Sequence, residues 1–368
     1  MQPLIKWPGG KSSEIEYIKD IIPNNYNRYV EPFCGGAAVY FYLEPQKSII
    51  NDISQNLTGF YKLIKEEDIN FKSYMYELNL MWDNIKIKAK SSIQDLKKIF
   101  EKYKQKHTDK EETKNLLDKY VLELLKNESY SVIGHQLLVK EMKRTVVDKF
   151  FRTYNNEIKL GVELSNEDLE ENLLTGISGG IYMAARTEFN NLEHCIDLIK
   201  KEYSKKIALF YFVREFCYGS MFRYNKNGDF NIPYGGKGYN HKDYKKKLDL
   251  IFSNKTIILL KNTEIKNGDF EKVFDELTEN DFIFIDPPYD TDFSDYENKS
   301  FDKQDQERLA NTLEKTKAKF ILIIKNTPFI YNLYNKECFK IKSFDNNYAY
   351  CVKNRNNRKV EHLIITNY

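Results

Sequence analysis

A carboxylate, two prolines and a tyrosine stand directly after an apolar run that is typical of a β-strand. They are Asp286, Pro287, Pro288 and Tyr289, and the run is DFIFID (281–286). Ligands of open α/β sheets bind at the carboxyl ends of the strands, and prolines offer carbonyl acceptors without an N–H donor. An exocyclic amine could donate to the Asp286 carboxylate and to the Pro287 carbonyl, with its lone pair towards an electrophilic methyl group and its base stacked near Tyr289. The alternative interpretation is an ordinary strand-ending turn.

Two glycine-containing segments nearer the N-terminus could hold a nucleoside. In EPFCGG, Phe33 and Gly35 follow an apolar run, and glycine lets a ligand approach the backbone closely. The next strand-like run ends at Asp52, an acid that could accept hydrogen bonds from ribose hydroxyls. In KWPGGK, Trp7 and Lys11 suit an aromatic or anionic ligand, and a flexible basic leader is the plainer interpretation. Because no G-x-G-x-x-G motif is present, the pattern favours a nucleoside over a dinucleotide.

The composition excludes several classes of protein. With 41% hydrophobic and 30% charged residues, the chain is too apolar to be disordered. Its five cysteines form no C-x-x-C pair and the histidines do not cluster with them, so we expect neither a metal site nor a disulfide framework. No apolar run reaches the roughly 20 residues that span a bilayer. We therefore expect a cytoplasmic protein without membrane association.

Short apolar runs alternate with helical patterns in two blocks, which predicts βαβ units and a parallel sheet. The runs expected to form strands are RYVEPF (28–33), SIIND (48–52), TIILL (256–260), DFIFID (281–286) and FILIIK (320–325). Helices are expected from Ala37, over 302–317, and through most of 55–210. A hairpin signal follows at Asn227-Gly228 within RYNKNGDFNIPYGG (223–236). The sequence predicts one domain of residues 1–60 and 250–368, interrupted by a helical and hairpin domain of residues 61–249.

A lysine-rich stretch coincides with one of the expected helices. Between Lys86 and Lys110 nine lysines stand against three acids, although the whole chain carries a net charge of only +3. Within 91–104 the apolar side chains recur on one helical face, at Ile93, Leu96, Phe100 and Tyr103. Lys97, Lys98, Lys102 and Lys104 are then expected on or beside the solvated surface. They either form a plain soluble face or contact DNA phosphates.

Five motifs occur in a fixed order: KWPGGK, EPFCGG, ND, RYNKNGDFNIPYG and DPPY. This combination resembles the Dam-like (D12 class) family of N6-adenine-specific DNA methyltransferases. The resemblance implies an α/β fold, with a Rossmann-like methyltransferase sheet and an inserted, mainly helical target-recognition domain that carries a β-hairpin. It also implies S-adenosyl-L-methionine as cofactor, double-stranded DNA as substrate and an adenine flipped into the DPPY pocket. A role in a restriction-modification system, beside a cognate restriction endonuclease, is compatible with it.

The resemblance also implies roles for residues at matching positions. Those expected to bind the cofactor are Trp7, Lys11, Phe33, Gly35, Asp52 for the ribose, Asp269 and Phe270 for the adenine, and Asp286. Those expected to act in catalysis are Asp286, Pro287 and Tyr289, and those expected to bind DNA are Tyr218, Arg223 and Pro233. Tyr218 would wedge into the duplex, Arg223 would bond a base edge and Pro233 would make an apolar base contact.

The chain departs from the family pattern in two places. Ala37 stands where many members have a second glycine, which bears on cofactor affinity, and the insertion at about 66–175 contains no family motif. Methylation of cytosine N4 or of RNA adenine uses a similar amine and remains an alternative, as does a DNA-binding protein that retains the fold without catalysis. The recognised bases, the number of strands modified and the oligomeric state are left open.

Overall fold

The computed structural model describes residues 1–368 apart from 12–13, 196–201, 222, 289–300 and 348–358. The chain divides into two compact units. The sheet unit consists of Met1–Glu66 and Phe252–Tyr368, and the helical unit consists of Glu67–Ile251. Both ends of the chain therefore build the same unit, which brings together segments that are far apart in the sequence.

The sheet unit contains a seven-stranded sheet in the order β3-β2-β1-β4-β5-β7-β6. The strands are β1 (Tyr29–Glu31), β2 (Ser48–Asp52), β3 (Thr263–Asn267), β4 (Phe282–Ile285), β5 (Lys319–Lys325), β6 (Lys340–Asn347) and β7 (Lys359–Thr366). β1 to β5 run parallel, whereas β7 is antiparallel to both β5 and β6. The order reverses between β1 and β4, and ligands of doubly wound sheets bind at the carboxyl ends of the strands beside such a point. The sheet has the predicted Rossmann-like form.

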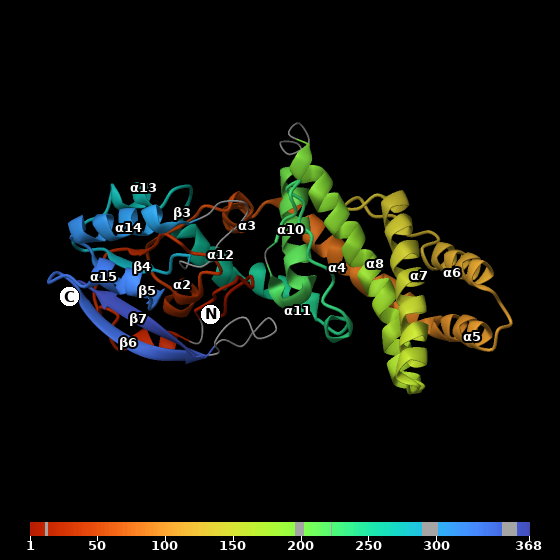
Figure 1. Ribbon diagram of the computed structural model, residues 1–368. Coiled ribbons are helices and arrows are strands. Elements are labelled where there is room, and N and C mark those ends of the chain that lie inside the picture. The colour runs from red at the N-terminus through yellow and green to blue at the C-terminus, as the bar shows by residue number, and fades with distance from the viewer. Residues whose placement is uncertain (12–13, 196–201, 222, 289–300, 348–358) are drawn as a thin grey trace. The chain divides into compact units, whose positions relative to one another are not determined.

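Helices cover the sheet unit's strands, as Figure 1 shows for α13 and α14. They are α1 (Ile15–Ile18), α2 (Ala38–Leu43), α3 (Gln55–Lys65), α12 (Asn254–Lys261), α13 (Glu271–Phe274), α14 (Lys303–Lys315) and α15 (Pro328–Tyr334). Val30 of β1 joins the core cluster that includes Leu309 of α14, whereas the ring of Tyr29 lies 6.4 Å from that of Tyr40 of α2. Successive side chains of a strand point to opposite faces. Both faces of β1 are therefore buried.

The predicted strand TIILL (256–260) is wrong, because this run lies in helix α12 and the strand is the following segment, β3. The Ser253 side chain accepts a hydrogen bond from the Thr256 amide and thus caps the helix. Thr256, Leu259 and Leu260 are buried while Ile258 is 60% exposed, which is a helical pattern of burial. A short apolar run does not distinguish a strand from a helix by its periodicity.

The helical unit consists mainly of long helices, as predicted. They are α4 (Ile69–Ser91), α5 (Ile93–Lys104), α6 (Lys110–Leu124), α7 (His135–Leu160), α8 (Asn166–His194), α10 (Tyr203–Phe216) and α11 (Tyr244–Ile251), with 3-10 turns η1 (Tyr218–Ser220) and η2 (Lys237–Tyr239). α7 and α8 pack closely at Gly180, where a Cβ atom would lie 2.7 Å from the Met142 Cα. Among the described helices of both units, none combines the length and the apolar character that a membrane crossing requires.

Candidate active site

A cavity of about 280 Å³ lies in the sheet unit, where the loops after β1, β2, β3 and β4 meet the N-terminal segment. The lining residues that the sequence predicted are Trp7, Lys11, Phe33, Gly35, Asp52, Asp269, Phe270, Asp286 and Pro287. Their segments are distant in the sequence and meet because neighbouring parallel strands end at one edge of the sheet. Tyr289 lies outside the described residues.

The turn after β1 is shaped around Trp7. Gly35 has a φ of +46°, and a Cβ atom there would lie 2.7 Å from the Trp7 Cδ1, so only glycine fits. The Gly35 amide donates to Asp52 Oδ2 at 2.9 Å, and the Ser54 amide donates to Asp52 Oδ1 at 2.9 Å. Ala37 has a left-handed backbone with a φ of 53°, which costs a non-glycine residue about 1–2 kcal/mol. Glycine would adopt this conformation without that cost.

Three phenylalanine rings form an apolar cluster along the cavity. The centroids of Phe33 and Phe270 are 5.2 Å apart, and the Phe301 ring lies 5.5 Å from Phe33, edge to face, and 5.9 Å from Phe270. All three residues line the cavity. The sequence motifs included Phe33 and Phe270 but gave no signal for Phe301, which precedes α14 outside any motif.

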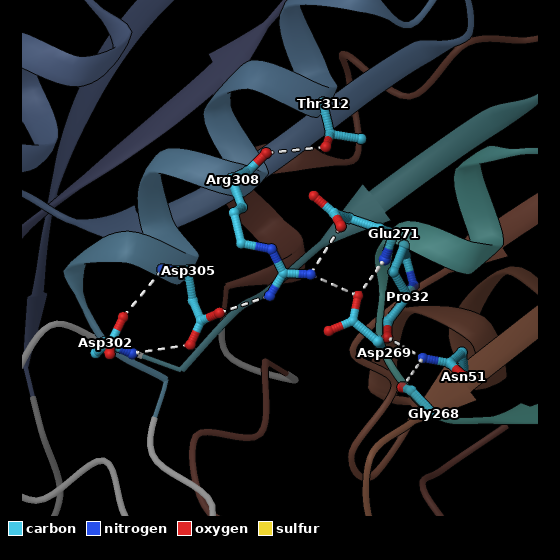
Figure 2. Close-up of polar contacts among 9 residues, drawn as sticks. All are labelled: Pro32, Asn51, Gly268, Asp269, Glu271, Asp302, Asp305, Arg308 and Thr312. Carbon is cyan, nitrogen blue, oxygen red and sulfur yellow. Dashed lines mark hydrogen bonds and ion pairs between the residues drawn. The ribbon is translucent and has the colours of Figure 1, made fainter.

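A buried amide connects two of the loops that build the cavity. Asn51 Nδ2 donates to the Pro32 carbonyl at 2.9 Å and to the Gly268 carbonyl at 3.1 Å, as Figure 2 shows. These bonds join the end of β1 to the loop after β3. Asp269, the next residue, is thereby held at the cavity wall.

Lys11 and Asp286 form an ion pair in the cavity. Lys11 Nζ lies 2.9 Å from Asp286 Oδ1 and also donates to the Gly9 carbonyl at 2.9 Å. The Lys11 side chain is only 4% exposed and that of Asp286 is 20% exposed. Burial raises the pKa of the Asp286 carboxyl above its ordinary value, and the Lys11 ammonium opposes this rise. The geometry thus pairs a residue predicted to bind the cofactor with the predicted catalytic carboxylate.

The turn after Asp286 is fixed by a side chain of α14. Gln306, which is fully buried, donates from Nε2 to the Pro288 carbonyl at 2.9 Å. Within the described part of the chain, no hydrogen bond reaches the Pro287 carbonyl. The turn therefore presents the Asp286 carboxylate and the Pro287 carbonyl as acceptors for a ligand. Gln306 was not found by sequence reasoning, because the helical pattern of 302–317 identifies a buried face but not a partner.

A second carboxylate, which is buried, lines the cavity at the end of β1. The Tyr29 hydroxyl donates to Glu31 Oε2 at 3.0 Å, and Glu31 is 2% exposed. Burial raises the pKa of Glu31 well above its ordinary value, and the nearby Asp286 charge adds to the rise. Sequence reasoning did not select Glu31, although it belongs to EPFCGG.

The predicted DNA-binding residues lie in the helical unit. Tyr218 is 46% exposed, and its amide donates to the Pro233 carbonyl at 2.9 Å. Pro233 and Arg223 are both exposed, and Arg223 Nε donates to Asn231 Oδ1 at 2.9 Å. Tyr218, Arg223 and Pro233 therefore belong to one surface loop.

The hairpin signal was right in place and different in detail. Asn225 and Asp229 form the closing pair, with the Asn225 amide donating to the Asp229 carbonyl at 2.9 Å. Gly228, with a φ of +83°, ends a three-residue loop, whereas the Asn-Gly signal favours a two-residue turn. Beyond it, the described residues form two isolated antiparallel bridges in place of continuous strands, Tyr224 with Phe230 and Cys217 with Tyr234.

One face of α8 holds this loop through four residues spaced four apart, here called the α8 ladder: Tyr182, Arg186, Asn190 and His194. The Tyr182 hydroxyl and Arg186 Nη1 donate to the Ile232 carbonyl at 2.7 and 3.0 Å. Asn190 bonds both the amide and the carbonyl of Phe230, at 3.0 and 3.1 Å. His194 Nε2 lies 2.7 Å from Asp229 Oδ1. The spacing matches the helical repeat, so a single helix face fixes the loop backbone.

The lysine-rich stretch lies mainly on α4 and α5, and several of its lysines have partners inside the helical unit. Lys104 lies 3.5 Å from Glu157 Oε2 and 2.8 Å from Glu163 Oε1. Lys88 pairs with Glu128, and Lys98 lies 3.5 Å from Asp95. The predicted apolar stripe of α5 is present, with Ile93, Leu96 and Phe100 buried.

Comparisons with known proteins agree with the fold. The model of the family described as D12 class N6 adenine-specific DNA methyltransferase matches residues 7–178 and 146–350. The chain is 25% identical over 339 residues to the Type II methyltransferase M.CviBI of Paramecium bursaria Chlorella virus NC1A, covering 91% of this chain and 87% of the relative. It is 27% identical over 364 residues to the Type II methyltransferase M.MjaIII of Methanocaldococcus jannaschii, covering 93% and 90%.

Proposed function

The chain belongs to the D12 class of N6 adenine-specific DNA methyltransferases, and we propose that it uses S-adenosyl-L-methionine to methylate adenine within a specific DNA sequence. The observation that carries this proposal is the single cavity wall on which the motif residues meet, from Trp7 to Pro287. The catalytic role is assigned to the sheet unit, and DNA recognition is assigned to the helical unit.

The cavity residues fit the cofactor. The cluster of Phe33, Phe270 and Phe301 offers an apolar surface for an adenine ring. Asp269 offers an acceptor for the adenine amine. Asp52, which lines the cavity and binds the amides of Gly35 and Ser54, offers a carboxylate for the ribose hydroxyls. Carboxylates suit a cationic ligand, and S-adenosyl-L-methionine supplies an activated methyl group on a positive sulfur.

The residues of the DPPY turn would orient the target amine. Asp286 and the Pro287 carbonyl each accept one hydrogen bond from the N6 amino group, which directs the nitrogen lone pair towards the methyl donor. Lys11 favours the ionised form of Asp286 and fixes one of its oxygens. Gln306 fixes the turn itself through the Pro288 carbonyl. The amine would attack the methyl group directly as its bond to sulfur breaks, with S-adenosyl-L-homocysteine as the leaving group and one amine proton lost, so no covalent enzyme intermediate is needed. Tyr289 is proposed to stack on the flipped base.

The loop 223–233, together with Tyr218 of η1, is proposed to read double-stranded DNA. Its exposed Arg223 and Pro233 can reach base edges while the α8 ladder holds the backbone beneath them. The names of the relatives, which are Type II methyltransferases, support a further proposal that the enzyme protects DNA against a cognate restriction endonuclease.

Replacing the proposed catalytic carboxylate tests the function. Asp286→Asn should reduce transfer of labelled methyl groups to DNA by at least about 100-fold, the loss typical when one pre-organised partner of the transition state is removed. Asp275→Asn, an exposed carboxylate outside the cavity, is the matched control and should retain full activity. Sequencing of the methylated DNA for N6-methyladenine identifies the product. Transfer by Asp286→Asn at more than a tenth of the normal rate, with the fold intact, would overturn the assignment.

A further inference from the structure

Arg308 of α14 binds three carboxylates, as Figure 2 shows, and two of them, those of Asp269 and Asp305, line the cavity. Its Nη2 lies 2.9 Å from Asp269 Oδ1 and 2.8 Å from Glu271 Oε2, and its Nη1 lies 2.7 Å from Asp305 Oδ1. Glu271, followed by Asp269, raises the pKa of Arg308 above its ordinary value. The guanidinium therefore stays protonated and joins α14 to the loop after β3.

The start of α14 sets the position of this arginine. Asp302 caps the helix by accepting from the amides of Gln304 and Asp305, and the Asp302 amide donates back to Asp305 Oδ2 at 3.2 Å. This capping box fixes the Asp305 carboxylate, whose other oxygen receives Arg308 Nη1. Arg308 is thus held in place about one helical turn after Asp305.

Asp269 has one oxygen committed and one available. Its Oδ1 accepts from Arg308 Nη2 and from the Glu271 amide at 3.0 Å. Among the described residues, no donor is bonded to Asp269 Oδ2, and the residue lines the cavity. The Arg308 guanidinium also lies 5.1 Å from the centroid of the Phe270 ring. One side chain therefore touches both residues that are expected to hold the cofactor's adenine.

We propose that Arg308 is a positioning residue for adenine recognition, and that it acts by orienting Asp269 so that Oδ2 accepts from the exocyclic amine. This inference rests on the proposed use of S-adenosyl-L-methionine. A purine with a carbonyl oxygen at position 6 would place that acceptor against the Asp269 Oδ2 acceptor, and the two oxygens would repel each other. A site built around such a hydrogen bond rejects analogues that cannot form it. Arg308 therefore increases the preference for adenine over a 6-oxo purine.

The alternative is an ion-pair network that only stabilises the surface. The Arg308 side chain is 39% exposed, and exposed ion pairs contribute little to folding. The chain offers a matched control in Arg28, which binds Asp281 through Nε and Nη2 at 3.0 and 2.8 Å. Arg28 precedes β1 and Asp281 precedes β4, at the amino ends of these strands, and neither lines the cavity. The two arginines make similar ion pairs, one near the carboxyl ends of the strands and the other at their amino ends.

Calorimetric titration with S-adenosylhomocysteine and S-inosylhomocysteine tests the proposal. The unsubstituted enzyme should prefer the adenosyl compound by at least about 100-fold. Arg308→Gln should weaken adenosyl binding about tenfold while inosyl binding changes less than twofold, and Arg308→Lys should recover part of the preference. Arg28→Gln should leave the preference unchanged. In an Asp269→Asn background, Arg308→Gln should cause no further loss, because both substitutions remove the same interaction.

The outcomes separate this inference from the proposed function. Equal weakening of both compounds by Arg308→Gln, or an unchanged preference in a folded variant, would overturn the positioning role while the cofactor assignment stands. If the unsubstituted enzyme binds the adenosyl compound no better than the inosyl compound, or binds neither, the assignment of the cavity to the cofactor's adenine fails as well. Thermal unfolding of each variant shows whether the fold is retained, and Arg308→Lys serves where Arg308→Gln does not fold.

Discussion

The cavity of the sheet unit and the loop 223–233 of the helical unit are held in opposite ways. In the cavity, side chains with proposed functions bind one another, as Lys11 binds Asp286. In the loop, the backbone is bound from outside by the α8 ladder, while the side chains of Arg223 and Pro233 are exposed. In the cavity the side chains themselves are fixed by their contacts. In the loop the α8 ladder fixes the backbone, and the exposed side chains project from it.

This difference indicates which substitutions each region can tolerate. In the cavity, replacing one partner removes a charged contact from a largely buried site, which is costly, so the arrangement suits a single chemistry. In the loop, an exposed side chain can change without loss of the backbone's support, which suits an element that selects a DNA sequence. We therefore expect substitutions in the cavity to slow methylation at every DNA site, and substitutions in the loop to change the choice among sites.

The largest effect expected from the comparison is the pH response of Lys11→Met. An opposite charge at this distance lowers a carboxyl pKa by about 1–3 units, so its removal should raise the pKa of Asp286 further. Because Asp286 is proposed to accept a hydrogen bond from the target amine as a carboxylate, the acidic limb of the rate profile should move to higher pH by a similar amount. Single-turnover rates at saturating cofactor, measured across pH on one DNA site, provide the check.

Lys6→Met is the control for Lys11→Met, because Lys6 is exposed and lies outside the cavity lining. It should leave the pH profile in place. If Lys11→Met slows the reaction equally at all pH values, the ion pair with Asp286 has no part in setting the active protonation state.

The loop should show the opposite behaviour in Arg223→Ala. Loss of one bidentate contact to a base edge should cost about 1–3 kcal/mol on the preferred site and relax the choice at one base position. The rate on the relaxed sites should stay near normal, since the cavity is untouched. The measurement is the set of N6-methyladenine positions in randomised DNA, with Lys226→Ala, an exposed substitution in the same loop, as control. Uniform slowing at all sites would make Arg223 a phosphate contact.

A smaller change in site choice is expected from Asn190→Ala in the α8 ladder. The substitution removes both hydrogen bonds to the Phe230 backbone, which is buried, and should lower the free energy of unfolding by about 1–3 kcal/mol. A loosened loop should reduce discrimination between sites by less than tenfold. The exposed neighbour Asn191 provides the control Asn191→Ala, which should change neither quantity. Unaltered site choice in a destabilised Asn190→Ala would limit the ladder to a structural role.

The sequence predicts much of the cavity because its residues stand in motifs at strand ends, where topology brings them together. Phe33, Asp52 and Asp286 were found in this way. The contacts between segments could not be found, since no local pattern states that Lys11 meets Asp286 or that Gln306 meets Pro288. Helical periodicity identifies a buried face of α14 but not the partners of its polar residues.

For the fold too, features set by a local sequence pattern were predicted, whereas features set by contacts with other residues were not. The apolar run of β4 and the helical pattern of α5 were predicted correctly, because each element is determined by its own burial pattern. The run 256–260 was assigned to a strand, although the capping contact between Ser253 and Thr256 starts a helix there. The α8 ladder is visible in the sequence only as four polar residues spaced four apart, which does not identify the loop they bind.

The smallest effect is expected from the lysines of α5, which belong to neither region. Replacing Lys97, Lys98, Lys102 and Lys104 by Ala should change the slope of log affinity against log salt by less than one unit, because Lys104 is held by Glu157 and Glu163 and Lys98 lies near Asp95. Neither the preferred sequence nor the single-turnover rate should change. A slope flattened by about one unit for each lysine removed would show that these side chains bind DNA phosphates. DNA affinity would then have a third source, independent of both the cavity and the loop.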